Sequence, residues 1–317
     1  MNAARSALPV ALQLCPFSAY LEDGLRARCE VIAWHSLDDA ARKAFLAARA
    51  ADVRAVVSGG HIGCPPELMR ALPELRIIAI NGVGIDKVDL ALARSRGVQV
   101  TTTPGVLTDD VADLAVGLVI ALLRGIPAGD AHVRAGAWPG GERPLARKVS
   151  GRRFGIVGMG QIGQAIARRL SPFGPVAWTG PNAKDVPWPR HAGVLELAAG
   201  CDVLVLACPA NESTRGLVTA SVLDALGPAG YLVNVARGSV VDETALGAAL
   251  EAGRIAGAAL DVFADEPHVP QSLRDSPRTV LTPHVASATV ETRIGMADLV
   301  LANLDACLAG RPAPSAR

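Results

Sequence analysis

The feature that most constrains this chain is the glycine pattern G-x-G-x-x-G at residues 158–163, between a short β-type run and a helical pattern. In such a pattern Gly158 allows a tight turn, and Gly160 lets a pyrophosphate approach the bare backbone. Gly163 lets the helix lie close to the strand, and the phosphates bind free N–H groups at the helix N-terminus. A plain glycine turn is the alternative, but both flanks fit a dinucleotide-binding unit.

Length and composition narrow the fold class. A chain of 317 residues is long for one core, so we expect two domains. Apolar residues make up 50% of the chain and aromatic residues only 3%, so Ala, Val, Leu and Ile must build the core, as in parallel α/β sheets. The net charge is +1 with mixed signs, which argues against nucleic acid or an anionic membrane as a partner.

The cysteines and apolar runs indicate the compartment. None of the six cysteines stands in a C-x-x-C pattern, and their spacing fits neither a metal site nor a disulfide framework. We expect buried thiols in a reducing cytosol. The run Leu8–Cys15 serves better as a buried strand than as a signal peptide, and Val111–Leu123 is too short to span a bilayer. The sequence therefore predicts a soluble cytoplasmic protein.

Short apolar runs alternate with helical patterns along the chain, which predicts parallel sheets with helices on both faces. The expected strands are Val10–Leu14, Val31–Trp34, Ala55–Ser58, Ile77–Ile80, Val98–Thr101, Phe154–Val157, Pro175–Trp178, Val203–Ala207, Tyr231–Val235, Ala256–Val262 and Thr279–Leu281. The clearest helical patterns are Asp38–Arg49, Asp89–Arg96, Thr108–Arg124 and Thr289–Leu308. The last of these should cross back onto the first domain. We therefore expect a substrate-binding domain of residues 1–100 plus 288–317 and a dinucleotide-binding domain of residues 101–287.

Two irregular stretches invite a functional interpretation. The loop Asn81–Asp86 has two glycines beside a strand end, at the edge of the sheet where ligands bind in open α/β folds. An ordinary tight turn explains it equally well. The Gly-, Pro- and Arg-rich stretch 125–150 predicts an irregular arm. Trp138 near its middle is typical of a subunit interface, although local packing is an equal alternative.

The strand end at Thr179 bears on the choice of cofactor. In an NAD-specific site an Asp or Glu at this place holds the ribose 2′-hydroxyl, but here no acid appears before Asp185. The missing negative charge removes repulsion of a 2′-phosphate, and Lys184 adds attraction. NADP(H) is therefore favoured and NAD(H) remains possible, because the expected arginine is absent and Pro181 stands near its place.

Three polar residues, Arg237, Glu266 and His284, follow strand ends in the second half of the chain. Each alone has an ordinary interpretation, as a loop arginine, a solvated glutamate or a surface histidine. Strand ends of a doubly wound sheet converge on one crevice, so the three can meet there. His284 suits the proton donor that a hydride reduction of a ketone needs, with Glu266 favouring its imidazolium. Arg237 matches a substrate carboxylate, and Asp261 could accept from the nicotinamide amide.

Six stretches, in this order, resemble the D-isomer-specific 2-hydroxyacid dehydrogenases, in particular their glyoxylate/hydroxypyruvate reductase and hydroxyphenylpyruvate reductase branch. They are NGVGIDKVD (81–89), GVLTDDVADLAVGL (105–118), GIVGMGQIG (155–163), LVNVARGSVVDE (232–243), GAALDVFADEP (257–267) and LTPHVASATVETR (281–293). The resemblance implies two flavodoxin- and Rossmann-like domains with the active site in the cleft between them, and a homodimer.

The resemblance also implies roles for single residues. Arg237 would bind the substrate carboxylate, His284 would be the acid/base and Glu266 its partner. The substrate would also meet the amides of Val83 and Gly84, Ser287, and Trp138 from the second subunit. Cofactor contacts are implied for Thr108, Gly158, Gly160, Gln161, Ile162, Gly163, Thr179, Lys184, Cys208, Pro209, Thr214, Val235, Ala236, Asp261 and His284.

The leading functional hypothesis is NAD(P)H-dependent reduction of a small 2-oxo acid, such as glyoxylate or hydroxypyruvate, to the D-2-hydroxy acid. A reductase of larger aryl 2-oxo acids such as hydroxyphenylpyruvate is the second. A non-catalytic NAD(H)-sensing protein is the third, because the family also includes corepressors that keep the Arg, Glu and His set.

Overall fold

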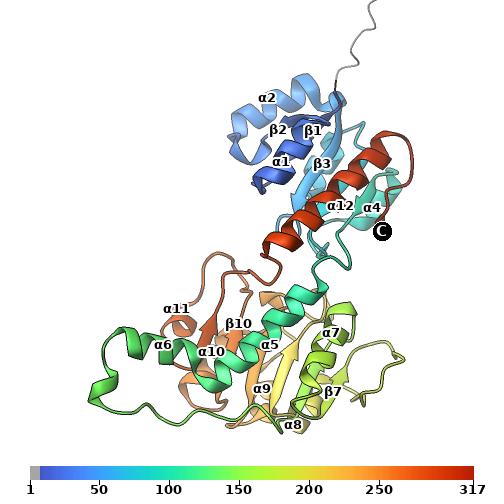
Figure 1. Cartoon of the computed structure of the whole chain (residues 1–317). Coiled ribbons are helices and arrows are strands. Elements are labelled where there is room, and N and C mark those ends of the chain that lie inside the picture. Colours follow the sequence, from blue (N-terminus) through green and yellow to red (C-terminus); the bar gives the residue numbers. More distant parts are fainter. Residues whose placement is uncertain (1–7) are drawn as a thin grey trace, which may run out of the picture. The chain divides into compact units, whose positions relative to one another are not determined.

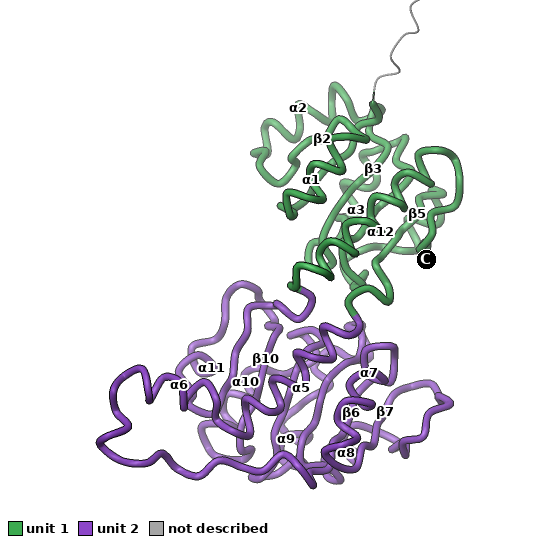
Figure 2. The backbone as a smooth tube through the Cα atoms, in the orientation of Figure 1, with its two compact units in different colours: residues 1–107, 288–317 green, residues 108–287 purple. Residues whose placement is uncertain are grey.

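Two parallel sheets organise the chain, one in each of two units. Figure 2 shows the two units in different colours. The structure is a computed structural model that describes residues 8–317. Among the described residues, unit 1 comprises 8–107 together with Ala288–Arg317, and unit 2 is Thr108–Ser287. The first boundary lies at Leu107 rather than at residue 100, because β5 (Gln99–Thr101) pairs with β4 (Ile77–Asn81) and completes the sheet of unit 1.

The sheet of unit 1 has the strand order β2-β1-β3-β4-β5 with all strands parallel, the order of flavodoxin-like folds. Its other strands are β1 (Val10–Gln13), β2 (Glu30–Ile32) and β3 (Val53–Gly59). Residues of β1, β3 and β4 are buried almost without exception, as expected for strands that are covered on both faces.

Helices cover both faces of this sheet (Figure 1). On one face α1 (Ala19–Arg26) and α12 (Val290–Leu308) bury leucines such as Leu21 and Leu304. The other face is covered by α2 (Asp39–Arg49), α3 (Pro66–Ala71) and α4 (Leu90–Ser95). The return of the last helix to unit 1 is confirmed, whereas α1 and α3 are short helices that the sequence did not reveal.

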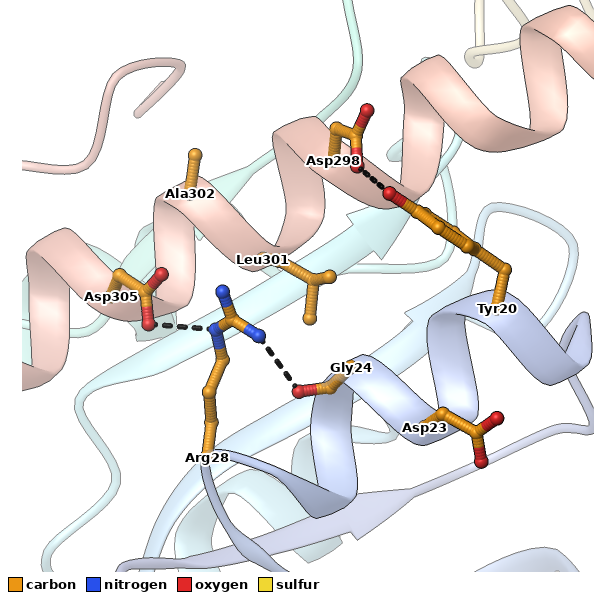
Figure 3. A pocket seen from close by; sticks show the side chains of 8 residues that line it. All are labelled: Tyr20, Asp23, Gly24, Arg28, Asp298, Leu301, Ala302 and Asp305. Carbon is orange, nitrogen blue, oxygen red and sulfur yellow. Dashed lines mark hydrogen bonds and ion pairs between the residues drawn. The ribbon is translucent and has the colours of Figure 1, made fainter.

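A groove on unit 1 follows the seam between α1 and α12 (Figure 3). The Tyr20 hydroxyl donates to Asp298 at 2.7 Å, and Arg28 pairs with Asp305 at 2.8 Å. Arg28 also donates to the carbonyl oxygen of Gly24 at 3.0 Å. These polar groups of the groove therefore bond to one another, and the groove is a consequence of how the two helices pack.

The sheet of unit 2 has the strand order β11-β10-β9-β8-β6-β7, again all parallel. Its strands are β6 (Phe154–Val157), β7 (Val176–Thr179), β8 (Val203–Leu206), β9 (Tyr231–Asn234), β10 (Gly257–Leu260) and β11 (Thr279–Leu281). The helices are α5 (Thr108–Arg124), α6 (Ile126–Arg134), α7 (Gln161–Leu170), α8 (Val194–Gly200), α9 (Ala220–Leu226), α10 (Glu243–Glu251) and α11 (Gln271–Arg274). The order changes direction between β6 and β8, so their carboxyl ends form the switch point where such sheets bind ligands.

The stretch after α5 differs from the expectation. We predicted an irregular arm for residues 125–150, but Ile126–Arg134 form α6. Gly125 breaks α5 with a left-handed φ of +61°, and Pro127 fits the first turn of the new helix, where its missing N–H costs no hydrogen bond. The rest of the arm contains one short 3₁₀ turn, Trp138–Gly140.

No single helix among the described residues is long and apolar enough to cross a membrane; α5 and α6 reach that length only together, across a bend of 61°.

Candidate functional site

The three predicted polar residues follow neighbouring strands. Arg237 follows β9, Glu266 follows β10 and His284 follows β11, and these three strands are adjacent in the parallel sheet of unit 2. Parallel strands present their carboxyl ends at one edge, so the loops that follow them meet there. The glycine pattern follows β6 at the same edge.

His284 and Glu266 form a direct pair. The Nδ1 atom of His284 lies 2.7 Å from Oε2 of Glu266. The other carboxylate oxygen of Glu266 accepts from the backbone N–H of Phe263 at 3.0 Å. Both side chains are about one-third exposed, so the pair is held by the protein and still faces outward. The imidazole therefore has its Nδ1 side fixed, and its Nε2 is the nitrogen available to a ligand.

The charge of Glu266 is stabilised in place. Partial burial acts to raise the pKa of Glu266, but the hydrogen bonds from His284 and from the Phe263 N–H, with the nearby charge of Arg237, outweigh it. The pKa of Glu266 therefore lies below its usual value. The carboxylate therefore stays ionised beside His284 and can accept a hydrogen bond from its Nδ1.

Asn234 and Gly238 fix the loop that carries Arg237. The side-chain amide of Asn234, at the end of β9, donates to the carbonyl oxygen of Arg237 at 3.0 Å and accepts from the N–H of Ala236 at 3.0 Å. A Cβ on Gly238 would collide with the backbone of Phe263 and Ala264. The Arg237 loop can therefore lie against the loop that leads to Glu266 only because residue 238 is glycine.

Asp261 holds the loop that presents His284. Its side chain is fully buried, and its carboxylate accepts from the Thr282 hydroxyl at 2.6 Å and from the N–H groups of Val285 at 2.9 Å and Ala286 at 3.0 Å. His284 has a left-handed φ of +52°, a conformation that costs free energy and persists only where neighbours impose it. These hydrogen bonds from both sides of His284 supply that constraint.

The glycine pattern has the geometry of a phosphate cradle. Gly158 has a φ of +95°, and a Cβ there would lie 2.7 Å from the Cα of Cys208. A Cβ on Gly163 would collide with the carbonyl oxygen of Gly158, whereas the space beside Gly160 is open. Helix α7 begins at Gln161, and no side chain caps its first N–H groups. The residues present therefore fit the pyrophosphate of a dinucleotide, which these N–H groups would hold.

The other predicted cofactor residues also lie in unit 2. Cys208 and Pro209 follow β8, and burial raises the pKa of the Cys208 thiol to about 11, so it is a neutral packing group. The Thr214 hydroxyl closes this loop by donating to the carbonyl oxygen of Pro209 at 2.8 Å. Val235 and Ala236, after β9, are buried. Ile162 lies in the first turn of α7, and Thr108 is the first residue of α5.

The strand end of β7 is closely tied to the glycine turn. Thr179 is buried, its hydroxyl donates to the carbonyl oxygen of His191 at 3.1 Å, and its own carbonyl oxygen accepts from the N–H of Gly158 at 2.9 Å. Lys184 lies exposed in the following loop. No carboxylate stands between Thr179 and Lys184.

The remaining predicted residues have these places. Val83 and Gly84 follow β4 in unit 1, in a loop that Gly82 enters with a φ of +157°. Ser287 is the half-buried last residue of unit 2, and Trp138 is 65% exposed on the arm. The roles assigned to these four residues stay predictions from the sequence.

Two residues that matter for the site were missed, and a third has a further role. Asn234 and Gly238 stand in one of the motifs of the sequence, yet we gave them no role. That Asp261 accepts from the nicotinamide amide stays a prediction, and its three hydrogen bonds also make it the support of the His284 loop. A buried Asn or Asp at a strand end is a signal that could have identified Asn234 and Asp261, since buried polar groups require partners.

Comparisons with known proteins agree with this geometry. Residues 116–286 match the NAD-binding domain of the D-isomer specific 2-hydroxyacid dehydrogenases. The chain is 46% identical to a hydroxyphenylpyruvate reductase of Plectranthus scutellarioides, over 95% of this chain and 96% of that protein. It is 45% identical to glyoxylate/hydroxypyruvate reductase A of Arabidopsis thaliana, with the same coverage. An NADPH-dependent glyoxylate/hydroxypyruvate reductase of Sinorhizobium meliloti, solved with NADP and malonate, is 40% identical with a TM-score of 0.91, over 98% of this chain and 97% of that one.

Proposed function

The chain belongs to the D-isomer specific 2-hydroxyacid dehydrogenase family, and from this premise we propose that it reduces small 2-oxo acids, such as glyoxylate or hydroxypyruvate, to D-2-hydroxy acids. It is an NAD(P)-dependent oxidoreductase. The observation that carries the proposal is the 2.7 Å pair of His284 and Glu266, at the sheet edge that also presents Arg237 and the glycine pattern.

The proposed reaction divides between a hydride and a proton. When bound, the reduced nicotinamide supplies a hydride to the carbonyl carbon of the substrate. We assign the proton to His284, whose Nε2 is left available to a substrate because Nδ1 faces Glu266. The proton passes from Nε2 to the carbonyl oxygen, so the alcohol forms and the imidazole becomes neutral. Glu266 orients the ring and stabilises its charged form, and Arg237 matches the substrate carboxylate with its planar fork.

For the cofactor we propose a preference for NADP(H) over NAD(H). The support is the absence of a carboxylate at the end of β7, where an acid would hold the ribose 2′-hydroxyl of NAD and repel a 2′-phosphate. The sinorhizobial relative is named NADPH-dependent and was solved with NADP, which is consistent with this preference.

We further propose a homodimer formed through the arm. Among the described residues, the large apolar side chains Ile126, Val133, Trp138 and Leu145 are all more than half exposed, and all belong to the arm of residues 125–150. Exposed apolar groups collected on one segment mark a protein interface. A second copy of this chain is the partner that a family resemblance favours.

A second candidate function is reduction of larger aryl 2-oxo acids. The relative named hydroxyphenylpyruvate reductase, 46% identical, favours it. The two candidates share the same catalytic groups and differ only in the size of the substrate that the enzyme accepts.

The test is the initial rate of NADPH and of NADH oxidation with glyoxylate, hydroxypyruvate and hydroxyphenylpyruvate. The proposal expects the highest kcat/KM with one of the two small acids and with NADPH. A higher kcat/KM with hydroxyphenylpyruvate would favour the second candidate. Binding of NADPH without turnover of any 2-oxo acid would instead indicate a cofactor-sensing protein.

A further inference from the structure

The segment after β7 folds back along that strand. The N–H of Trp178 donates to the carbonyl oxygen of Pro189 at 3.0 Å, and the N–H of His191 donates to the carbonyl oxygen of Trp178 at 2.8 Å. Trp178 and Arg190 thereby form a parallel bridge at the edge of the sheet. This bridge brings Arg190, from the far end of the loop, beside the end of β7.

The side chain of Arg190 is held at that strand end from two sides. Its Nη2 donates to the carbonyl oxygens of Gly180 at 2.7 Å and Pro181 at 3.2 Å. The guanidinium carbon lies 5.5 Å from the ring centroid of Trp178, within the range of a cation–π contact. Trp178 is buried, and its indole N–H donates to the carbonyl oxygen of Trp188 at 3.0 Å, so the ring is a fixed platform.

Two nitrogens of the Arg190 guanidinium remain available to a ligand. Its hydrogen bonds within the described part of the chain use Nη2 alone, and no carboxylate there forms an ion pair with it. Other arginines of unit 2, such as Arg153 and Arg169, are paired with Asp residues. Arg190 is exposed. Its Nε and Nη1 therefore offer a preoriented, charged pair of donors of the kind that binds phosphate.

The position of these donors relative to the glycine pattern suggests their ligand. Gly180, which Arg190 contacts, directly follows Thr179, and Thr179 is bonded to Gly158 of the glycine turn. In a dinucleotide-binding unit the residues at the end of this strand bind the adenosine ribose. We infer that Arg190 binds the 2′-phosphate of NADP(H), supplying from the returning segment the arginine that is absent at position 181. This inference rests on the proposed function.

The test measures binding directly, without turnover. Isothermal titration calorimetry compares 2′,5′-ADP, which carries the 2′-phosphate, with ADP, which lacks it. The proteins are the wild type, Arg190→Gln, Lys184→Gln, and Arg168→Gln as a control at an exposed arginine of α7. We expect Arg190→Gln to weaken 2′,5′-ADP binding by about tenfold or more, the size of a lost charged hydrogen bond, and to change ADP binding by less than about twofold. Lys184→Gln should have an effect of about threefold or less, and Arg168→Gln none.

Each of the other possible binding results would overturn the inference, and each identifies which part of it is wrong. If Arg190→Gln retains the wild-type ratio of the two affinities, or if Lys184→Gln carries the loss, the assignment to Arg190 is wrong. A wild type that binds ADP as tightly as 2′,5′-ADP overturns the inference and leaves dinucleotide binding intact. A wild type that binds neither nucleotide removes the proposed function as well.

Discussion

Gly238 lies directly against the backbone of Phe263, so closely that a methyl group on residue 238 would collide with it. This contact joins the two loops that carry Arg237 and Glu266. The Phe263 N–H in turn donates to Glu266, which pairs with His284. The geometry of the candidate catalytic groups therefore depends on a glycine that carries no functional group itself.

Gly238→Ala should damage the site more than a glycine replacement elsewhere in unit 2. Because backbone atoms surround the added methyl, the loops must separate, and we expect a loss of at least about 2 kcal/mol in unfolding free energy with a raised KM for the 2-oxo acid. Gly117→Ala is the control, since Gly117 is exposed in α5 with open space around it. It should stabilise by up to about 1 kcal/mol. Urea unfolding and steady-state kinetics measure both, and equal behaviour of the two variants would refute the contact argument.

Asp261→Asn should act on the His284 loop. An Asn offers one acceptor oxygen where the carboxylate has two, so at least one of the three donors loses its partner. We expect kcat to fall by about tenfold or more, while binding of 2′,5′-ADP stays within about twofold. A variant with unchanged kcat would show that the loop does not need this carboxylate.

Asp202 gives a prediction about pH. Burial acts to raise the pKa of Asp202, but its hydrogen bonds with the side chain and the N–H of Arg153 outweigh burial and lower it. A lowered folded-state pKa stabilises the protein above the unfolded pKa of about 3.9, and this stabilisation is lost as the pH falls through the folded value. Asp202→Asn should therefore cost about 1 kcal/mol at pH 7, since Arg153 is half exposed, and progressively less below about pH 4. Urea unfolding across this range checks it; a cost that grows toward low pH would contradict the assignment.

The arm gives a prediction about assembly. In the double variant Trp138→Glu, Leu145→Glu two exposed apolar groups, at 65% and 95% exposure, become charged. We expect light scattering after size exclusion to shift from dimer to monomer at micromolar concentration, because buried unpaired charges are costly in an interface. Leu195→Glu, at a 52% exposed leucine of α8, is the control and should remain dimeric. A double variant that stays dimeric would place the interface elsewhere.

Much of the fold could be predicted because its strands are buried on both faces and read as apolar runs. Thr279–Leu281 and Thr108–Arg124 were predicted with the bounds that the structure gives them. The misses are short elements whose stability comes from packing rather than from a sequence pattern. Helix α1 depends on burying Leu21 and Leu25 against the sheet, and α6 lies in the Gly-, Pro- and Arg-rich stretch that predicted an irregular arm.

For the site, the sequence predicted that Arg237, Glu266 and His284 carry the chemistry, but it did not reveal the residues that position them. His284 and Glu266 could be expected to meet because their strands are neighbours in a doubly wound sheet. The hydrogen bonds of Asn234 and Asp261, and the return of Arg190 to the end of β7, depend on the course of loops without periodicity. No local pattern encodes such contacts.

The most direct test of the central claim is the turnover of His284→Asn. Asn tolerates the left-handed φ of +52°, so the backbone can stay in place while the proton donor is removed. The account predicts that kcat for glyoxylate or hydroxypyruvate falls by about 10² to 10⁴-fold, the usual contribution of a general acid, while the affinity for NADPH changes by less than about threefold. Near-wild-type turnover would contradict it, because the proton would then come from another group.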